Sequence, residues 1–378
     1  MLSSGQEYSY SRYDSKEGLA GSTVYCVTQD RDGFMWFGTE TGLSRFDGTH
    51  FRNFTREDGL PDNDIIQLFA DTKGRVWISP FKKTVCYYYK GIIHTSQNDT
   101  LIKKLNIQDN VMRFTEDVAG NILLQEKNRL HLIQTNGQVS TILTDGKNPF
   151  VYIELIARRK EGGFWIFMGG NMYAFINNHF VLSKKLNYST EHFTYASFTS
   201  ETFIWRSKDN EMATLSLPVN KIQYYPFWNG KGHINVAVID EHFVASCSQD
   251  GAFVYNVDNP DSIQHYLPGI PVSNMLKDSE GNWWFCTFGN GIYRLNSAVA
   301  QNQRFGSMNG QDFQVLSFMQ YGNWILAGTR LNSIHKLSML TGQWQGRINL
   351  PDDHTNTIYA MATTAENRVI LGTKNYIA

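Results

Sequence analysis

The chain has few of the residues on which metal centres, nucleic-acid surfaces and membrane spans depend. It holds four cysteines in 378 residues, and no two of them form the C-x-x-C pair of a common zinc site. The formal net charge is −1 and basic runs are short, which argues against nucleic-acid binding because phosphate attraction needs a basic surface. No segment approaches the roughly 20 apolar residues that a membrane-spanning helix needs.

Catalytic motifs are also missing. The sequence has no H-E-x-x-H metal motif and no G-x-S-x-G nucleophile turn. Asp30–Gly33 matches a calcium loop only at its start, because the later acidic positions are lacking. We therefore expect no cofactor, no metal and no catalytic residue. Glu154, Glu161 and Asp240-Glu241 stay open as paired carboxylates for glycoside hydrolysis, because such pairs must lie about 5–10 Å apart in a cleft and a sequence shows no distances.

What the sequence does contain is a repeat of just over 40 residues. The segment Gly33–Gly48 has a weaker copy that starts at Gly74 and another that starts at Gly281. If Trp36 is taken as the anchor, nine equivalent positions occur at intervals of 39 to 46 residues. The anchors are Trp36, Trp77, Leu123, Trp165, Trp205, Ala245, Trp284, Leu326 and Ile370. A repeat of this length sets the architecture of the chain.

Each copy predicts four strands joined by tight turns. In the first copy Val24–Thr28 alternates between apolar and polar residues, and Asp30–Gly33 has the residues of a turn. Further strands are predicted at Phe34–Gly38, Leu43–Phe46 and His50–Phe54. No stretch of the chain sustains a helical apolar period with caps at both ends. Four strands in about 40 residues are typical of a β-propeller blade.

The large and sulfur-containing residues of the second predicted strands are expected to be buried. A single twisted sheet cannot cover both of its faces, whereas a ring of sheets covers them mutually. Tryptophans at five anchors would fill the space between neighbouring sheets, each burying on the order of 150–250 Å². Cys247 and Cys286 fall at matching positions in neighbouring copies, which favours buried thiols over a disulfide.

The amino-terminal residues predict how the ring closes. Residues 8–13 form a strand-like piece before Gly18-Leu19, just as Phe51–Phe54 precedes Gly59-Leu60. They are therefore expected to be the outer strand of a blade whose inner strands come last. The predicted fold is all-β, with a seven-bladed β-propeller of four-stranded antiparallel blades at residues 1–302 and the first blades of a second propeller at 303–378. We expect a piece of a longer protein, since the second ring would be incomplete. A single ring of eight or nine blades is the alternative.

The first copy also carries a family resemblance. Gly33–Gly48, with Asp30 before it and the Gly18-Leu19 lead-in, resembles the two-component regulator propeller repeat. The resemblance implies the periplasmic sensor region of an inner-membrane hybrid two-component histidine kinase, without a catalytic activity of its own. It also implies a ligand such as a small oligosaccharide and regulation of the genes for its use. The partner would be the remainder of the same sensor protein; homodimer formation stays open, and no nucleic acid would be bound.

Candidate ligand-binding residues come from the predicted loops between second and third strands. Such loops gather at the mouth of a propeller, where a rigid scaffold positions them. Sugars need planar hydrogen-bonding groups for their hydroxyls and an apolar surface for their ring carbons. The candidates that offer this mixture are Lys82, Asn128, Arg206, Lys208, Asp209, Phe288 and Asn290. A protein-binding surface scaffold and a propeller polysaccharide lyase or glycosidase stay open as alternative functions.

Overall fold

The computed structural model describes most of the chain as two compact units. The described residues are 9–143, 153–185, 195–197, 202–206, 212–217, 221–225, 233–240, 242–259, 263–296, 307–308, 311–312, 314–330, 333–338, 344–350, 357–364, 366 and 368–373. The larger unit is Ser9–Gln301, and the smaller one consists of Met1–Tyr8 and Asn302–Ala378.

The described part of the larger unit forms seven four-stranded antiparallel sheets. In chain order they contain β2 (Val24–Gln29), β3 (Met35–Thr39), β4 (Leu43–Phe46) and β5 (Phe51–Phe54); β6 (Ile65–Ala70), β7 (Val76–Pro80), β8 (Cys86–Tyr89) and β9 (Ile92–His94); β10 (Arg113–Glu116), β11 (Ile122–Gln125), β12 (Arg129–Ile133) and β13 (Val139–Leu143); β14 (Ile153–Arg158), β15 (Phe164–Met168), β16 (Asn171–Ile176) and β17 (His179–Lys185); β18 (Tyr195–Ser197), β19 (Thr202–Arg206), β20 (Met212–Ser216) and β21 (Lys221–Tyr225); β22 (His233–Val238), β23 (Phe243–Ser248), β24 (Gly251–Asn256) and β25 (Ile263–Tyr266); and β26 (Val272–Lys277), β27 (Trp283–Thr287), β28 (Ile292–Leu295) and β1 (Tyr10–Tyr13). Two short helices, η1 (Arg56–Asp58) and α1 (Thr100–Lys104), lie in connections between sheets.

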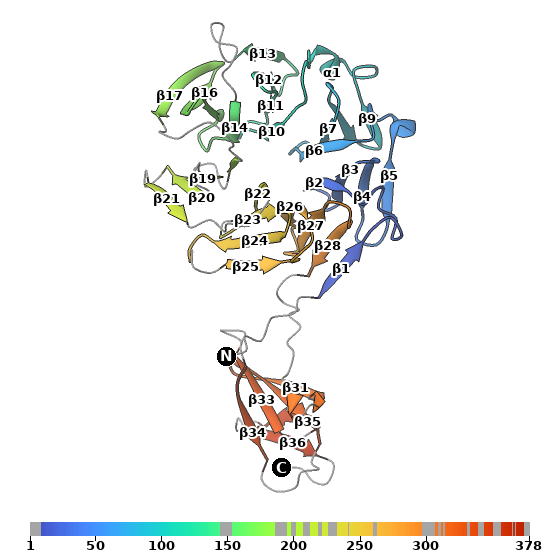
Figure 1. Ribbon diagram of the computed structural model, residues 1–378, viewed down its shortest axis with the longest axis vertical. Coiled ribbons are helices and arrows are strands. Elements are labelled where there is room, and N and C mark those ends of the chain that lie inside the picture. Colours follow the sequence, from blue (N-terminus) through green and yellow to red (C-terminus); the bar gives the residue numbers. More distant parts are fainter. Residues whose placement is uncertain are drawn as a thin grey trace. The chain divides into compact units, whose positions relative to one another are not determined.

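The sheets follow one another around a closed ring (Figure 1). The first strand of each sheet contacts the first strand of the next, from β2 through β6, β10, β14, β18 and β22 to β26. β26 in turn contacts β2, and β1 pairs with β28 as the outermost strand of the last sheet. The all-β propeller fold is therefore confirmed, and the predicted strands of the first copy agree with the structure to within one residue at each end.

The smaller unit has the same strand pattern. Its four-stranded sheet contains β31 (Val315–Tyr321), β32 (Trp324–Thr329), β33 (Ser333–Ser338) and β34 (Trp344–Asn349). β35 (Ile358–Thr363) pairs with β36 (Val369–Thr373) beside it, and β29 (Ser307–Met308) pairs with β30 (Gln311–Asp312). The predicted anchors Leu326 and Ile370 fall in β32 and β36, each the second strand of its sheet.

The anchor tryptophans are buried between sheets, and an aspartate holds three of them. Trp36, Trp77 and Trp284 are at most 2% exposed. The indole N–H of Trp77 donates to Asp71 Oδ2 at 2.8 Å, and the same bond joins Trp284 to Asp278. Trp36 donates to Asp30 Oδ2 at 2.6 Å. In these three copies an aspartate six residues before the anchor tryptophan therefore accepts its indole N–H, a contact that was not predicted from the sequence.

In the fourth copy an arginine, and not an aspartate, contacts the anchor tryptophan. Arg159 stands six residues before Trp165, where the first, second, third and seventh copies have aspartate. Its guanidinium lies 4.6 Å from the centroid of the Trp165 ring, within the range of a cation–π contact. The side chain of Trp205 lies outside the described residues. All four cysteines are buried free thiols, which confirms the prediction for Cys247 and Cys286.

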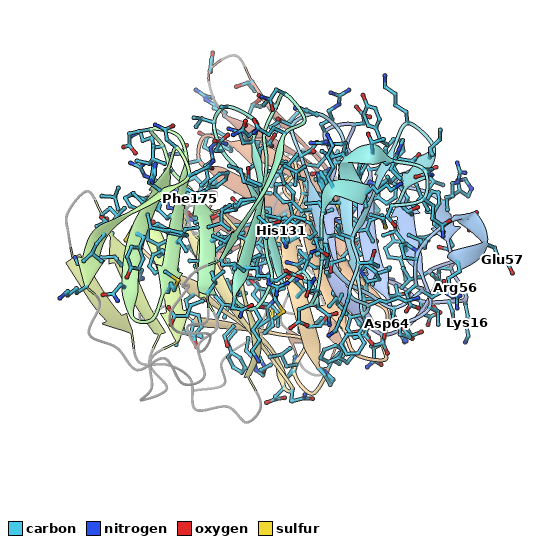
Figure 2. The ribbon with its side chains drawn as sticks, turned by 90° about the horizontal axis from the view of Figure 1, so that it is seen from above. Lys16, Arg56, Glu57, Asp64, His131 and Phe175 are labelled. Carbon is cyan, nitrogen blue, oxygen red and sulfur yellow. The ribbon has the colours of Figure 1, made fainter. Side chains whose placement is uncertain are left out.

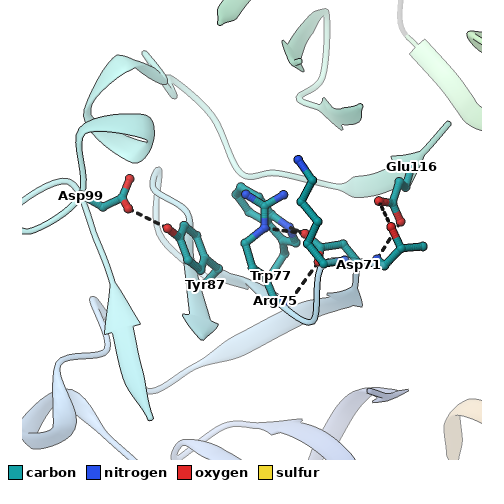
Figure 3. A network of polar contacts seen from close by, with 8 residues as sticks. Asp71, Arg75, Trp77, Tyr87, Asp99 and Glu116 are labelled. Carbon is teal, nitrogen blue, oxygen red and sulfur yellow. Dashed lines mark hydrogen bonds and ion pairs between the residues drawn. The ribbon is translucent and has the colours of Figure 1, made fainter. Parts of the chain in front are cut away.

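The residues that directly follow Asp71 and Asp278 form hydrogen bonds across sheet boundaries. Thr72, which follows Asp71, donates its N–H and hydroxyl to the Glu116 carboxylate of the next sheet, at 2.9 and 2.6 Å (Figure 3). Ser279 N–H donates to Gln29 Oε1 in the same way across the boundary where the ring closes. Because these bonds join different sheets, they fix the angle between blades as well as the turn itself.

Candidate functional site

One end of the ring collects the connections that enter the first strand of each sheet and leave the second. In an antiparallel sheet these two connections lie at the same end. Glu40 N–H donates to the Thr23 carbonyl, Phe81 N–H to that of Asp64, and Phe288 N–H to that of Pro271. We call this end of the ring the mouth and define it by Glu40, Phe81 and Phe288. Figure 2 shows Asp64 toward one edge of the ring, on the side of Lys16 and Arg56.

The first strands carry a repeated irregularity just inside the mouth. The pairing register slips at the second residue of β2, β6, β14, β22 and β26. A bulge of this kind inserts one residue and re-aims its side chain, and bulges are frequent at ring rims and beside binding sites. The bulged residues are Tyr25, Ile66, Glu154, Ile234 and Ser273. They differ in chemistry, and Ser273 is buried with its hydroxyl bonded to the Val24 carbonyl.

An aromatic and acidic cluster forms where the first sheet meets its neighbours. The Tyr25 ring lies edge-on to the Phe288 ring, with 6.0 Å between centroids. The Tyr25 hydroxyl is hydrogen-bonded to Asp64, whose Oδ1 is buried without a partner among the described residues. Burial, with the nearby carboxylate of Asp62, raises the pKa of Asp64. Burial, with Asp64 and Glu40 close by, also raises the pKa of Tyr25.

Glu154 is the most perturbed carboxyl group at the mouth. Burial raises its pKa to about 7, against the opposing effect of hydrogen bonds from the backbone N–H groups of Gly170 and Gly169. One carboxyl oxygen, Oε2, is buried without a partner among the described residues. Glu161 lies beyond the far end of β14, so the structure does not join it to Glu154 as a catalytic pair. Asp240, also in a turn between first and second strands, pairs with Lys277 at 2.6 Å.

A cavity of about 430 Å³ opens beside the mouth, where loops of two neighbouring sheets meet. One wall comes from η1 and the turn after it, a second from the β7–β8 loop, and a third from the segment that follows β9. The lining residues are Arg56, Gly59, Leu60, Pro61, Lys82, Thr84, Thr95, Ser96 and Gln97. We call this the Arg56–Lys82 cavity, after its two cationic side chains.

The structure places the described candidate residues in different loops. Lys82 lines the Arg56–Lys82 cavity, with its Nζ 3.5 Å from the Pro61 carbonyl oxygen. Phe288 and Asn290 share the β27–β28 loop, where Phe288 packs on Tyr25 and the Asn290 carbonyl accepts a bond from Arg12 Nε at 3.1 Å. Asn128 lies in the β11–β12 turn. The four candidates that the structure describes, Lys82, Asn128, Phe288 and Asn290, therefore lie in three separate loops.

The remaining candidates are Arg206, Lys208 and Asp209. Arg206 is the last residue of β19, and its side chain lies outside the described residues. Lys208 and Asp209 lie outside the described residues entirely. These three stay predictions.

The residues that the first strands and the intersheet loops contribute were not predicted from the sequence. Tyr25 and Asp64 stand at the start of first strands, where apolar and polar residues alternate and no motif marks a bulge. Arg56 and Gln97 come from connections between copies, outside the repeated segment. A search of the connections that flank Lys82 for further hydrogen-bonding side chains would have found both.

Two features of the described residues bear on cofactors and membranes. No group of three or more His, Cys, Asp or Glu side chains in the described ranges is placed to hold a metal ion. No helix in the same ranges is long and apolar enough to cross a membrane.

One segment of the chain matches a known family of repeats. Residues 18–41 match the family model described as two component regulator propeller. The first copy of the repeat is therefore similar to the two-component regulator propeller repeat. This confirms the resemblance seen around Gly33–Gly48 and the Gly18-Leu19 lead-in, within the segment that matches. No match was found among the curated proteins.

Solved structures show the same fold. The extracellular domain of a putative hybrid two-component system from B. thetaiotaomicron is 16% identical, with a TM-score of 0.62 over 97% of this chain and 52% of that one. A streptogramin B lyase is 15% identical, with a TM-score of 0.61 over 76% of this chain and 97% of that one. PorZ, a surface component of the type-IX secretion system of Porphyromonas gingivalis, is 9% identical, with a TM-score of 0.55 over 96% and 57%. This chain thus spans about half the length of the two-component domain.

Proposed function

We propose that this chain is a non-catalytic, periplasmic ligand-sensing region of a hybrid two-component sensor. It responds to a glycan fragment and regulates the genes for using it, and its partner is the remainder of the same protein. The observation that carries the proposal is the regulator-propeller match at residues 18–41, within a chain that superposes over 97% of its length on an extracellular two-component domain. Residues 1–302 would be its first seven-bladed ring and residues 303–378 the start of a second.

The chemistry of the mouth supports a sugar as the ligand. Phe81 exposes 63% of its surface, and the Tyr25–Phe288 pair adds a second aromatic surface. Sugar rings present apolar faces of C–H groups that pack on such side chains, while carboxylates accept hydrogen bonds from sugar hydroxyls. Asp64 and Glu40 place carboxyl groups beside the aromatic pair.

The test is calorimetric titration of the 378-residue chain, and of the whole sensor, with a panel of neutral and acidic oligosaccharides. Binding of one glycan, together with induction of its utilisation genes in cells and its loss in a deletion of the sensor, is the expected result. If neither protein binds any oligosaccharide of the panel, direct glycan sensing is refuted.

A lyase or glycosidase is the second candidate, and one observation favours it. Glu154 combines burial, an unpartnered oxygen and a pKa of about 7, which suits a general base or acid at neutral pH. The structural similarity to a streptogramin B lyase shows that this fold can carry an enzyme. Turnover of a polysaccharide that disappears in Glu154→Gln would establish this candidate. Unchanged substrate after prolonged incubation, with binding retained, would exclude it.

A further inference from the structure

The Arg56–Lys82 cavity is lined by several hydrogen-bond donors that have no partner among the described residues. The side chains of Arg56, Thr84, Ser96 and Gln97 form no hydrogen bond or ion pair with any described residue. Lys82 makes only a long contact of 3.5 Å with a carbonyl oxygen. Side chains on a rigid framework that meet in one cavity without satisfying one another are available for a ligand.

Among the described residues no ion pair joins Arg56 or Lys82 to an acidic neighbour, and the nearby carboxylates hold other partners. Asp58 Oδ2 accepts the N–H of Thr55 at 2.8 Å as part of a capping box, and Asp62 Oδ1 accepts that of Asn63 at 2.8 Å. Asp99 is held by the Tyr87 hydroxyl at 2.6 Å and by the first N–H groups of α1 (Figure 3).

Glu57 is the remaining acid next to Arg56, and it does not line the cavity. It is exposed on η1 and appears at the outer edge of Figure 2. The cavity therefore presents two positive charges with no opposing carboxylate among its lining residues.

One side of the cavity is apolar and rigid. Leu60 is buried in the core between the first two sheets, next to Ile93 and Ile65. Pro61 follows it and has a fixed φ angle. The cavity volume of about 430 Å³ falls within the range of small-molecule sites, roughly 300–1,000 Å³. A ligand with one C–H face, several hydroxyls and an anionic group fits this lining, whereas a simple anion would leave the hydroxyl and amide donors unused.

We propose that the Arg56–Lys82 cavity binds an acidic saccharide, a sugar that carries a carboxylate or a sulfate group. Arg56 and Lys82 hold the anionic group, Thr84, Ser96 and Gln97 hold hydroxyls, and Pro61, backed by the buried Leu60, supports the ring carbons. Arginine is suited to the anion because its planar guanidinium can donate two parallel bonds to a carboxylate or a sulfate. This inference rests on the proposed sensing function and specifies the class of its ligand.

The experiment titrates the 378-residue chain with four probes: trigalacturonate, a sulfated galactose disaccharide, neutral galactotriose and sodium sulfate. The variants are Arg56→Gln, Lys82→Gln, and Lys83→Gln as the matched control. Lys83 is the next residue of the same exposed loop, and its substitution removes the same charge without touching the cavity lining. Because Arg56 and Lys82 are exposed, their substitution should leave the urea midpoint unchanged.

We expect at least one acidic saccharide to bind about tenfold or more tightly than galactotriose. Arg56→Gln and Lys82→Gln should each weaken it about tenfold or more, as the loss of a hydrogen bond to a charged group does. Lys83→Gln should bind like the parent, and raising the salt concentration should weaken binding of the acidic probe.

Three results would overturn the inference. Equal affinity for the acidic and neutral probes would remove the charge requirement. An acidic saccharide that binds equally well to the Arg56 and Lys82 variants would place its site elsewhere. Sulfate that binds as tightly as the saccharides would mean an adventitious ion only. In the first two cases, or if only neutral glycans bind, the sensing proposal survives; if no glycan of any kind binds, both proposals fail.

Discussion

Replacing Asp71 by alanine should destabilise the ring far more than the loss of an ordinary turn residue. Its Oδ2 accepts from the Trp77 indole at 2.8 Å and from Arg75 Nε at 2.6 Å (Figure 3). Its Oδ1 accepts from the backbone N–H groups of Lys73 and Arg75 at 3.0 and 2.9 Å. The Asp71 side chain is fully buried, and that of Arg75 is only 13% exposed. The substitution would therefore leave an indole N–H and a guanidinium without their acceptor.

The size of the effect follows from these contacts. Breaking a buried ion pair by removing one partner costs about 3–5 kcal/mol, and an unpaired buried donor alone costs about 1–3 kcal/mol. The Arg75 guanidinium can still turn partly to water. We therefore expect Asp71→Ala to lower the free energy of unfolding by about 3 kcal/mol, near the lower end of the range for a broken ion pair. Asp71→Asn should lose less, because the amide oxygen can still accept from the Trp77 indole.

Urea unfolding of the whole chain, followed by tryptophan fluorescence, measures this difference. Asp47→Ala is the matched control, because Asp47 also accepts two backbone N–H groups, at 2.8 and 2.7 Å, but lies in an exposed turn without a tryptophan partner. Its loss should cost about 1 kcal/mol. Equal midpoint shifts for Asp71→Ala and Asp47→Ala would refute the claim that the carboxylate–indole bond stabilises the blade.

Three further predictions follow from the described residues. Gly291→Ala should lower the urea midpoint more than Gly289→Ala, because both glycines have positive φ but only a Cβ at Gly291 would collide with the Tyr13 carbonyl of the closing strand; equal shifts would contradict this. Burial raises the pKa of Glu154 from 4.5 to about 7, so the folded chain binds this proton more tightly than the unfolded chain and loses stability as the pH rises from about 4 to beyond 7. Glu154→Gln should thus raise the midpoint relative to the parent at pH 8 but not at pH 4, and a pH-independent difference would argue against the shift. A thiol reagent should modify no cysteine of the native chain and all four in urea, since burial raises the pKa of each thiol; rapid labelling of native protein would show that the thiols are accessible.

Much of the architecture was predictable because each blade repeats the same local problem. A turn with aspartate and glycine precedes an aromatic strand, and the spacing of Asp30 and Trp36 recurs at Asp71 and Trp77. Local chemistry of this kind needs no knowledge of distant residues, so strands and turns were placed to within a residue in the first copy. The hydrogen bond from the Trp36 indole to the Asp30 carboxylate was not predicted, because it depends on how the strand folds back over the turn.

The candidate site was predicted less well, for a physical reason. Loops between second and third strands could be identified, and Lys82 does line a cavity. Its neighbour Arg56, however, belongs to the connection from the preceding sheet, and their meeting depends on the angle between two sheets. Tyr25 and Asp64 likewise come together because a bulge and a ring closure re-aim side chains that no periodicity relates.

The amino-acid sequence by itself determined the repeat, the four-stranded unit and the burial of the tryptophans, because these follow from residue type and from separations of a few residues along the chain. Tertiary structure alone decided which loop side chains meet, which carboxyl groups lose water and which donors remain unused. Those properties depend on distances between sheets, and such distances are set by the packing of whole blades rather than by any single segment.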